Sequence, residues 1–158
     1  MIYVEILGRM GNQMFSYAMA RKLQSKDPGQ GIAFDFSNFE FNDETWINYM
    51  EYFKCSNNIH IEKRKLNLIQ RSVLYLYFKK RKRVQTWNDV KALAARFSNI
   101  LEIFGIYMYT IGYHQFRYQS MFKNKLVLGF YESPRFFDSI HDIIRDDSSV
   151  EMRSHYAK

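Results

Sequence analysis

Residues 8–23 hold the side chains and glycines whose types and spacing best suit ligand chemistry. Gly8 and Gly11 lie three residues apart, just after the apolar run of residues 2–7, and Asn12 and Gln13 follow them. This pattern predicts a strand, a two-glycine turn and a helix that opens at Asn12 or Gln13. Backbone N–H groups at a helix N-terminus attract anions, and an asparagine amide both donates and accepts hydrogen bonds. The segment therefore predicts a phosphate or sugar-nucleotide site, with an ordinary strand-to-helix turn as the alternative.

The elements that must position this segment follow a strand and helix alternation. Strands are predicted at residues 2–7, 31–36, 59–61 and 126–130, and helices at residues 13–25, 63–83, 88–104 and 133–144. The first strand, helix and strand predict a parallel pair joined by a right-handed crossover. Ser133 as N-cap with Pro134 at the first helical position explains the start of the last helix. Residues 106–122 are aromatic and ambiguous.

The glycine spacing matches neither the dinucleotide fingerprint nor the phosphate-loop motif. The wider string of residues 8–18, G-x-x-G-N-Q-M-F-x-Y-A, closely resembles the amino-terminal motif of the α-1,2-fucosyltransferases, which transfer fucose from GDP-fucose to a galactoside. Residues 32–39 and 128–137 resemble two later blocks of that family, in the same order. The third block departs from the family pattern, because Glu132 replaces the usual Gln and Pro134 is additional.

The resemblance implies an α/β fold: a single Rossmann-like lobe with a parallel sheet, the N-terminal half of a two-lobe (B-type) glycosyltransferase. The family's H-x-R-x-G-D donor motif does not occur in the 158 residues. We therefore expect residues 1–158 to be the amino-terminal lobe without the carboxy-terminal GDP-fucose-binding lobe, and to be inactive alone.

The resemblance also implies the partners, which are GDP-fucose and a galactose-terminated glycan acceptor, with no metal and no further cofactor. It places donor binding at five residues, Arg9, Met10, Gly11, Asn12 and Gln13. It assigns no catalytic residue. Asp35, at the end of the second predicted strand, is interpreted as a turn former or hydrogen-bond partner in preference to a catalytic carboxylate.

The composition is that of a folded protein, with 47% hydrophobic and 18% aromatic residues. The single Cys55 cannot form an internal disulfide. We find no export signal and no apolar run of about 18 residues, so we expect a cytoplasmic protein, peripheral at most on the inner face of the membrane.

The net charge of +7 is concentrated in one segment. Residues 63–83 contain nine of the 23 basic residues and no acidic residue. The segment predicts a helix with basic ends, which would either bind an anionic membrane surface or pack on the core with a solvated basic tail. The membrane-surface candidates are Lys79, Lys80, Arg81, Lys82 and Arg83. Nucleic acid is not favoured, because no zinc spacing, RNA-binding aromatic motif or helix-turn-helix pattern accompanies the charge.

Three functions other than transfer follow from these observations. The first is a peripheral membrane or interaction module that uses the basic helix. The second is a small nucleotide-binding domain. The third alternative is a degenerate product with no function.

Overall fold

The computed structural model describes residues 1–37, 47–53, 59–108, 113, 115–118, 121–129, 131 and 133–149, without the side chains of Trp87 and Lys91. Cys55, Phe130 and Glu132 lie outside the described residues, as do Asn38 and Phe39 of the second family-like block.

The described residues form one five-stranded sheet in the order β3-β2-β1-β5-β4, with every neighbouring pair parallel. The strands are β1 (Ile2–Glu5), β2 (Ile32–Asp35), β3 (Ile59–Ile61), β4 (Ile106–Met108) and β5 (Lys125–Leu128). β1 is central, and its Ile2 is in register with Ile32 of β2 and with Lys125 of β5. The prediction of an α/β fold with a parallel sheet is therefore confirmed.

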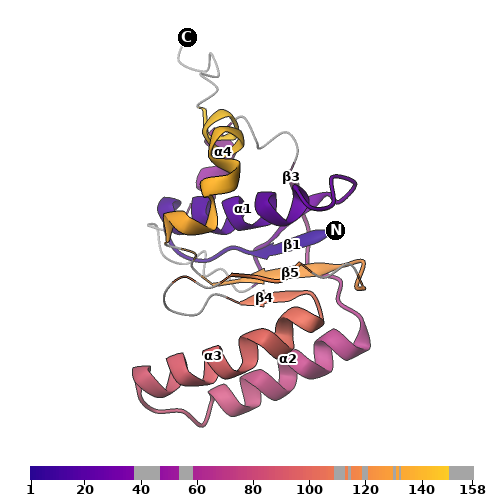
Figure 1. Ribbon diagram of the computed structural model, residues 1–158, viewed down its shortest axis with the longest axis vertical. Helices are drawn as coiled ribbons and strands as arrows, with labels where there is room; N and C mark the ends of the chain where they lie inside the picture. The colour runs from indigo at the N-terminus through magenta and orange to yellow at the C-terminus, as the bar shows by residue number, and fades with distance from the viewer. Residues whose placement is uncertain are drawn as a thin grey trace.

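Helices cover both faces of the sheet, as Figure 1 shows. α1 (Met10–Gln24) and α4 (His141–Asp147) lie on one face, and α2 (Leu68–Arg81) and α3 (Trp87–Ile103) lie on the other. The alternation of side chains along β1 divides the core accordingly, because Ile2 and Val4 pack toward α1 whereas Tyr3 packs toward α2 and α3. Tyr17 and Arg21 of α1 both contact the Asp147 carboxylate, at 2.9 and 2.6 Å, which attaches α4 to α1.

Three predicted helix starts are wrong, those at residues 13, 63 and 133. α1 begins at Met10, three residues before the predicted residue 13, because Gly8 breaks the chain with a φ of +73° and Arg9 occupies the N-cap. The helix predicted over residues 133–144 is instead two short 3-10 helices, Pro134–Phe136 and Asp138–Ile140, followed by α4. This tighter path buries Phe136, Phe137 and Ile140 in the core, and Ser133 makes no side-chain cap.

The helix predicted at residues 63–83 spans Leu68–Arg81, preceded by an extended stretch. Its N-terminus carries a capping box between Asn67 and Gln70. The buried Gln70 amide also donates to the carbonyl oxygens of Phe104 and Asn124, each at 2.8 Å. These bonds fix α2 against the sheet. No helix in the described part of the chain has both the length and the apolar character needed to cross a bilayer.

Candidate functional site

The loop between β1 and α1 is shaped by Gly8 and Asn12. Gly8 has a left-handed φ of +73°, and a Cβ added to it would lie 2.4 Å from the Asn12 Nδ2 atom. The Asn12 side chain therefore lies directly against the Gly8 backbone, where only a glycine fits. Asn12 is half-buried, and none of the described residues makes a hydrogen bond with its amide. Its donor and acceptor remain available beside the helix N-terminus.

Gln13 holds this loop in place. It is fully buried, and its Nε2 donates to the carbonyl oxygens of Gly8 at 3.0 Å and Ile47 at 2.8 Å. Its Oε1 accepts from the Tyr49 N–H at 3.0 Å. The whole amide is thus engaged by main chain, so Gln13 joins the loop to residues 47–49 and its side chain does not reach the exposed surface.

The first turn of α1 is open and electrostatically positive. The first intrahelical bond runs from the Gln13 N–H to the Arg9 carbonyl, so the N–H groups of Met10, Gly11 and Asn12 precede the hydrogen-bonded ladder. No side chain caps this end, and the first turn contains no acidic residue. The exposed Arg9 adds a cation to the positive end of the helix dipole, an arrangement that weakens the free helix but suits an anion. A Cβ at Gly11 would meet nothing within 4 Å, so a ligand can approach the backbone there.

The first and third family-like blocks lie side by side at the carboxyl ends of β1 and β5. Ser16 of α1 donates its hydroxyl to the Gly129 carbonyl at 3.0 Å, directly after β5. Gly129, like Gly8, has a positive φ, here +91°. Phe15 of α1 stacks on Phe137 with ring centroids 5.9 Å apart. Segments more than 110 residues apart in sequence therefore form one surface at the edge where open α/β sheets bind ligands.

Tyr131 supports this surface from inside the core. It is fully buried, and its hydroxyl donates to the Tyr107 carbonyl of β4 at 2.7 Å. Burial raises the pKa of the Tyr131 hydroxyl well above its usual value, so this group stays protonated. Its ring packs edge-on against Phe136 at 5.6 Å. Tyr131 acts as a rigid support, and its hydroxyl is not available for proton transfer.

A buried ion cluster of Glu5, Asp35 and Arg64 closes the carboxyl ends of β1 and β2. Arg64 contacts Glu5 Oε1 through one terminal nitrogen at 2.9 Å and Asp35 Oδ2 through Nε at 2.7 Å. The Asp35 Oδ1 atom accepts from the Ser37 N–H at 3.0 Å and from the Ser37 hydroxyl. Asp35 is 1% exposed. These contacts agree with Asp35 as a turn former and hydrogen-bond partner.

Sequence reasoning missed the roles of two residues in this region. Arg64 was assigned to the basic segment, but it is half-buried between two acids. The sequence did hold a signal for a buried cation near Glu5. Glu5 interrupts an apolar strand, and a buried carboxylate requires a cation or several donors. The crosslinking role of Gln13 had no comparable signal, since its partners are backbone groups of residues 8, 47 and 49.

The five predicted basic residues lie far from this loop. Lys79, Lys80 and Arg81 end α2, on the opposite face of the sheet, and Lys82 and Arg83 follow directly. All are exposed except the half-buried Arg81, and the Lys80 ammonium lies 5.0 Å from the ring centroid of Phe97. The structure therefore places the predicted donor-binding residues and the predicted membrane-surface residues on different parts of the molecule.

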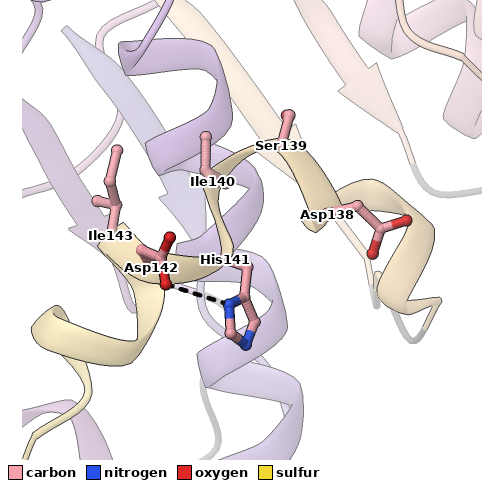
Figure 2. A pocket seen from close by; sticks show the side chains of 6 residues that line it. All are labelled: Asp138, Ser139, Ile140, His141, Asp142 and Ile143. Carbon is pink, nitrogen blue, oxygen red and sulfur yellow. Dashed lines mark ion pairs between the residues drawn. The ribbon is translucent and has the colours of Figure 1, made fainter.

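A hollow of about 450 Å³ is formed by the six residues 138–143 (Figure 2). Their side chains point in different directions, and the His141 and Asp142 side chains, 3.5 Å apart, are 69% and 84% exposed. This hollow shows no convergence of polar groups. Among the described residues, no three His, Cys, Asp or Glu side chains are grouped to hold a metal ion.

Comparisons of the chain with protein-family models, with curated proteins and with solved structures give no match. The fucosyltransferase resemblance therefore rests on the three blocks of sequence alone.

Proposed function

We propose that the exposed first turn of α1 binds the diphosphate of a nucleotide sugar. We further propose that the chain is the amino-terminal lobe of a two-lobe α-1,2-fucosyltransferase that uses GDP-fucose. The observation that supports this most directly is the meeting of the first and third family-like blocks, joined by the hydrogen bond from Ser16 to the Gly129 carbonyl. Two blocks that resemble one family in sequence thus share one surface, although nothing in their own composition requires it.

The electrostatics of the loop suit the chemistry of fucose transfer. In an inverting displacement, the galactose 2-oxygen forms a bond to the fucose anomeric carbon while the bond from that carbon to the diphosphate breaks. Negative charge then grows on the departing GDP, and donors placed in advance stabilise it. The N–H groups of Met10, Gly11 and Asn12, with the Asn12 amide and the Arg9 guanidinium, are the donors that this chain would supply.

The hydroxyl proton must pass to a base, and we assign none in this chain. Glu5 and Asp35 lie at the carboxyl ends of β1 and β2, and both contact Arg64. Asp35 also accepts from the Ser37 N–H, so these acids are already engaged by contacts within the chain. The ion cluster is therefore better interpreted as support for the strand ends.

The loop forms one wall of the proposed site. Gly11 faces open space, and the family's arginine-containing donor motif is not among the 158 residues. We expect purified residues 1–158 to transfer no fucose from GDP-fucose to a galactoside. Robust transfer by this polypeptide would overturn the one-wall proposal.

Thermal unfolding in the presence of GDP tests the binding proposal. GDP at about 100 times its Kd should add about 2.7 kcal/mol to the free energy of unfolding, a rise in Tm of roughly 5–10 °C for a domain of this size. Asn12→Ala should reduce that rise without lowering the Tm of the free protein, because its amide has no partner among the described residues. Asn88→Ala, at an exposed position of α3, is the matched control and should respond to GDP as the wild type does. An equal GDP response in Asn12→Ala, or none in the wild type, would contradict the proposal.

A further inference from the structure

The outward side of α2 is a candidate docking surface that the proposed function does not use. Gln70, Leu74 and Tyr77 face the sheet and α3 and are buried. The opposite side of the helix carries a line of residues at spacings of four, three and four, which are Leu68, Ser72, Tyr75 and Lys79. Leu68 is 78% exposed and Tyr75 is 64% exposed.

Further apolar side chains flank this line on both sides. Ile69, Leu76 and Phe78 are each more than two-fifths exposed. Together with Leu68 and Tyr75 they form the α2 outer face, five large apolar side chains on one 14-residue helix. Single exposed apolar residues are ordinary, but a contiguous group of this kind marks an interaction site.

Cations surround the α2 outer face. Lys79, Lys80, Lys82 and Arg83 are exposed at its C-terminal end, and Arg71 is exposed in its first half. A hollow of about 640 Å³ beside the helix is lined by Lys63, Lys65, Arg71, Tyr75 and Phe78, among others. No acidic residue occurs between positions 63 and 83. The surface thus combines aliphatic and aromatic groups with positive charge at both ends.

We propose that the α2 outer face docks on a lipid bilayer that contains anionic lipids. An amphipathic helix with leucine and aromatic side chains between lysines and arginines inserts its apolar groups at the level of the headgroups, while the cations meet the anionic surface. This binding is independent of the α1 loop, which lies on the opposite side of the sheet.

The same charges disfavour a second copy of the chain as the occupant. In a two-fold antiparallel pairing of α2 with itself, the basic C-terminal end of one helix meets Lys63 and Arg71 of the other. In a parallel pairing, residues 79–83 meet themselves. Cations oppose cations in both arrangements, and such contacts are costly when desolvated. Nucleic acid would satisfy the cations but would leave Leu68 and Leu76 in water.

Vesicle flotation tests the proposal with two variants that keep the buried side of α2 intact. The probe is a vesicle of phosphatidylcholine with phosphatidylserine, compared with pure phosphatidylcholine. Wild type should bind the anionic vesicles in a salt-sensitive way. Lys79→Gln/Lys82→Gln should weaken binding about 25-fold, because each cation near the surface contributes about five-fold. Leu68→Gln/Leu76→Gln should weaken it at least as much, through the lost insertion of apolar groups.

Two control variants test whether vesicle binding depends on the α2 outer face, and not on any exposed apolar group or cation of the protein. Tyr52→Gln removes a 60% exposed ring near α1, and Lys26→Gln removes an exposed cation after α1. Both should bind vesicles as the wild type does. Sedimentation velocity and competition by double-stranded DNA complete the test.

Three outcomes would overturn the proposal. The first is no binding to anionic vesicles. The second is binding that is lost in the lysine variant alone and abolished by DNA, which would indicate a nucleic-acid surface. The third is a dimer in solution that Leu68→Gln/Leu76→Gln dissociates, which would assign the face to a second copy of the chain.

Discussion

Alanine substitutions at Gly8 and Gly11 should change the stability of the protein in opposite directions, although the two glycines are three residues apart. At Gly8, alanine must adopt a φ of +73°, which costs about 1–2 kcal/mol for an L-residue. Its Cβ would also lie 2.4 Å from Asn12 Nδ2. Displacing the Asn12 side chain from its rotamer adds about 0.5–1.5 kcal/mol. We therefore expect Gly8→Ala to lower the free energy of unfolding by about 2–3 kcal/mol.

At Gly11 an alanine should instead stabilise the protein. The residue lies in the first turn of α1, and an added Cβ meets nothing within 4 Å. Alanine reduces the conformational freedom of the unfolded chain and favours the helix, so Gly11→Ala should raise the free energy of unfolding by about 0.4–1 kcal/mol. The same Cβ projects into the space proposed for the diphosphate and should diminish the rise in Tm caused by GDP.

Urea denaturation of the two variants and the wild type measures both effects. A further comparison of Gly8→Ala in the wild type and in Asn12→Ala isolates the clash, because truncating Asn12 removes the Nδ2 atom and should recover about 1 kcal/mol. Equal stabilities for Gly8→Ala and Gly11→Ala would refute the loop geometry. A stable Gly11→Ala variant that responds to GDP like the wild type would refute the proposed position of the ligand.

Three further predictions concern the groups that hold the loop and the sheet. Gln13→Ala should lower the free energy of unfolding by about 3 kcal/mol, because it removes the partner of three main-chain groups. In the same urea denaturation experiment, Gln85→Ala, at an exposed position, should stay within about 0.5 kcal/mol of wild type. Arg64→Met should cost about 3 kcal/mol, because it removes the cation that contacts two buried carboxylates. Lys65→Met, which breaks an exposed pair, should leave the urea midpoint nearly unchanged. Burial and the hydrogen bond to Asp27 raise the pKa of Tyr118 from 10.0 to about 12, so its contribution to stability is complete below pH 10 and is lost as the pH rises toward 12. In thermal melts, the advantage of wild type over Tyr118→Phe should therefore shrink over that pH interval. A constant difference in Tm would contradict the pKa shift.

Much of the sheet and of the helical layers was predictable from the residues. The residues at positions 2–7 and 59–61 indicated β1 and β3, and the helix predicted at residues 88–104 is found as α3. These are local patterns, in which the side chains that become buried are close in sequence. Their predictions are confirmed.

Features that depend on distant contacts were not predictable. The insertion of β5 between β1 and β4 is set by strand pairing across the chain, and no local pattern records it. The start of α1 at Met10 was missed because Arg9 and Gly11 are weak helix signals, whereas the positive φ of Gly8 is the actual break. The donor-binding roles of Arg9, Met10, Gly11 and Asn12 stay a prediction. The buried Gln13 side chain instead bonds to the main chain of residues 8 and 47 and holds the loop in place.

Amide chemical shifts recorded by NMR during a titration with GDP test the central claim most directly. If the first turn of α1 binds the diphosphate, the N–H signals of Met10, Gly11 and Asn12 should shift most, with smaller changes at Gly129 across the hydrogen bond from Ser16. Uridine and inorganic phosphate serve as the comparison probes, and only the phosphate-bearing probes should move these signals. Shifts confined to Arg71 and the basic residues 79–83, or no shifts at all, would contradict the claim that the loop after β1 is a nucleotide-sugar site.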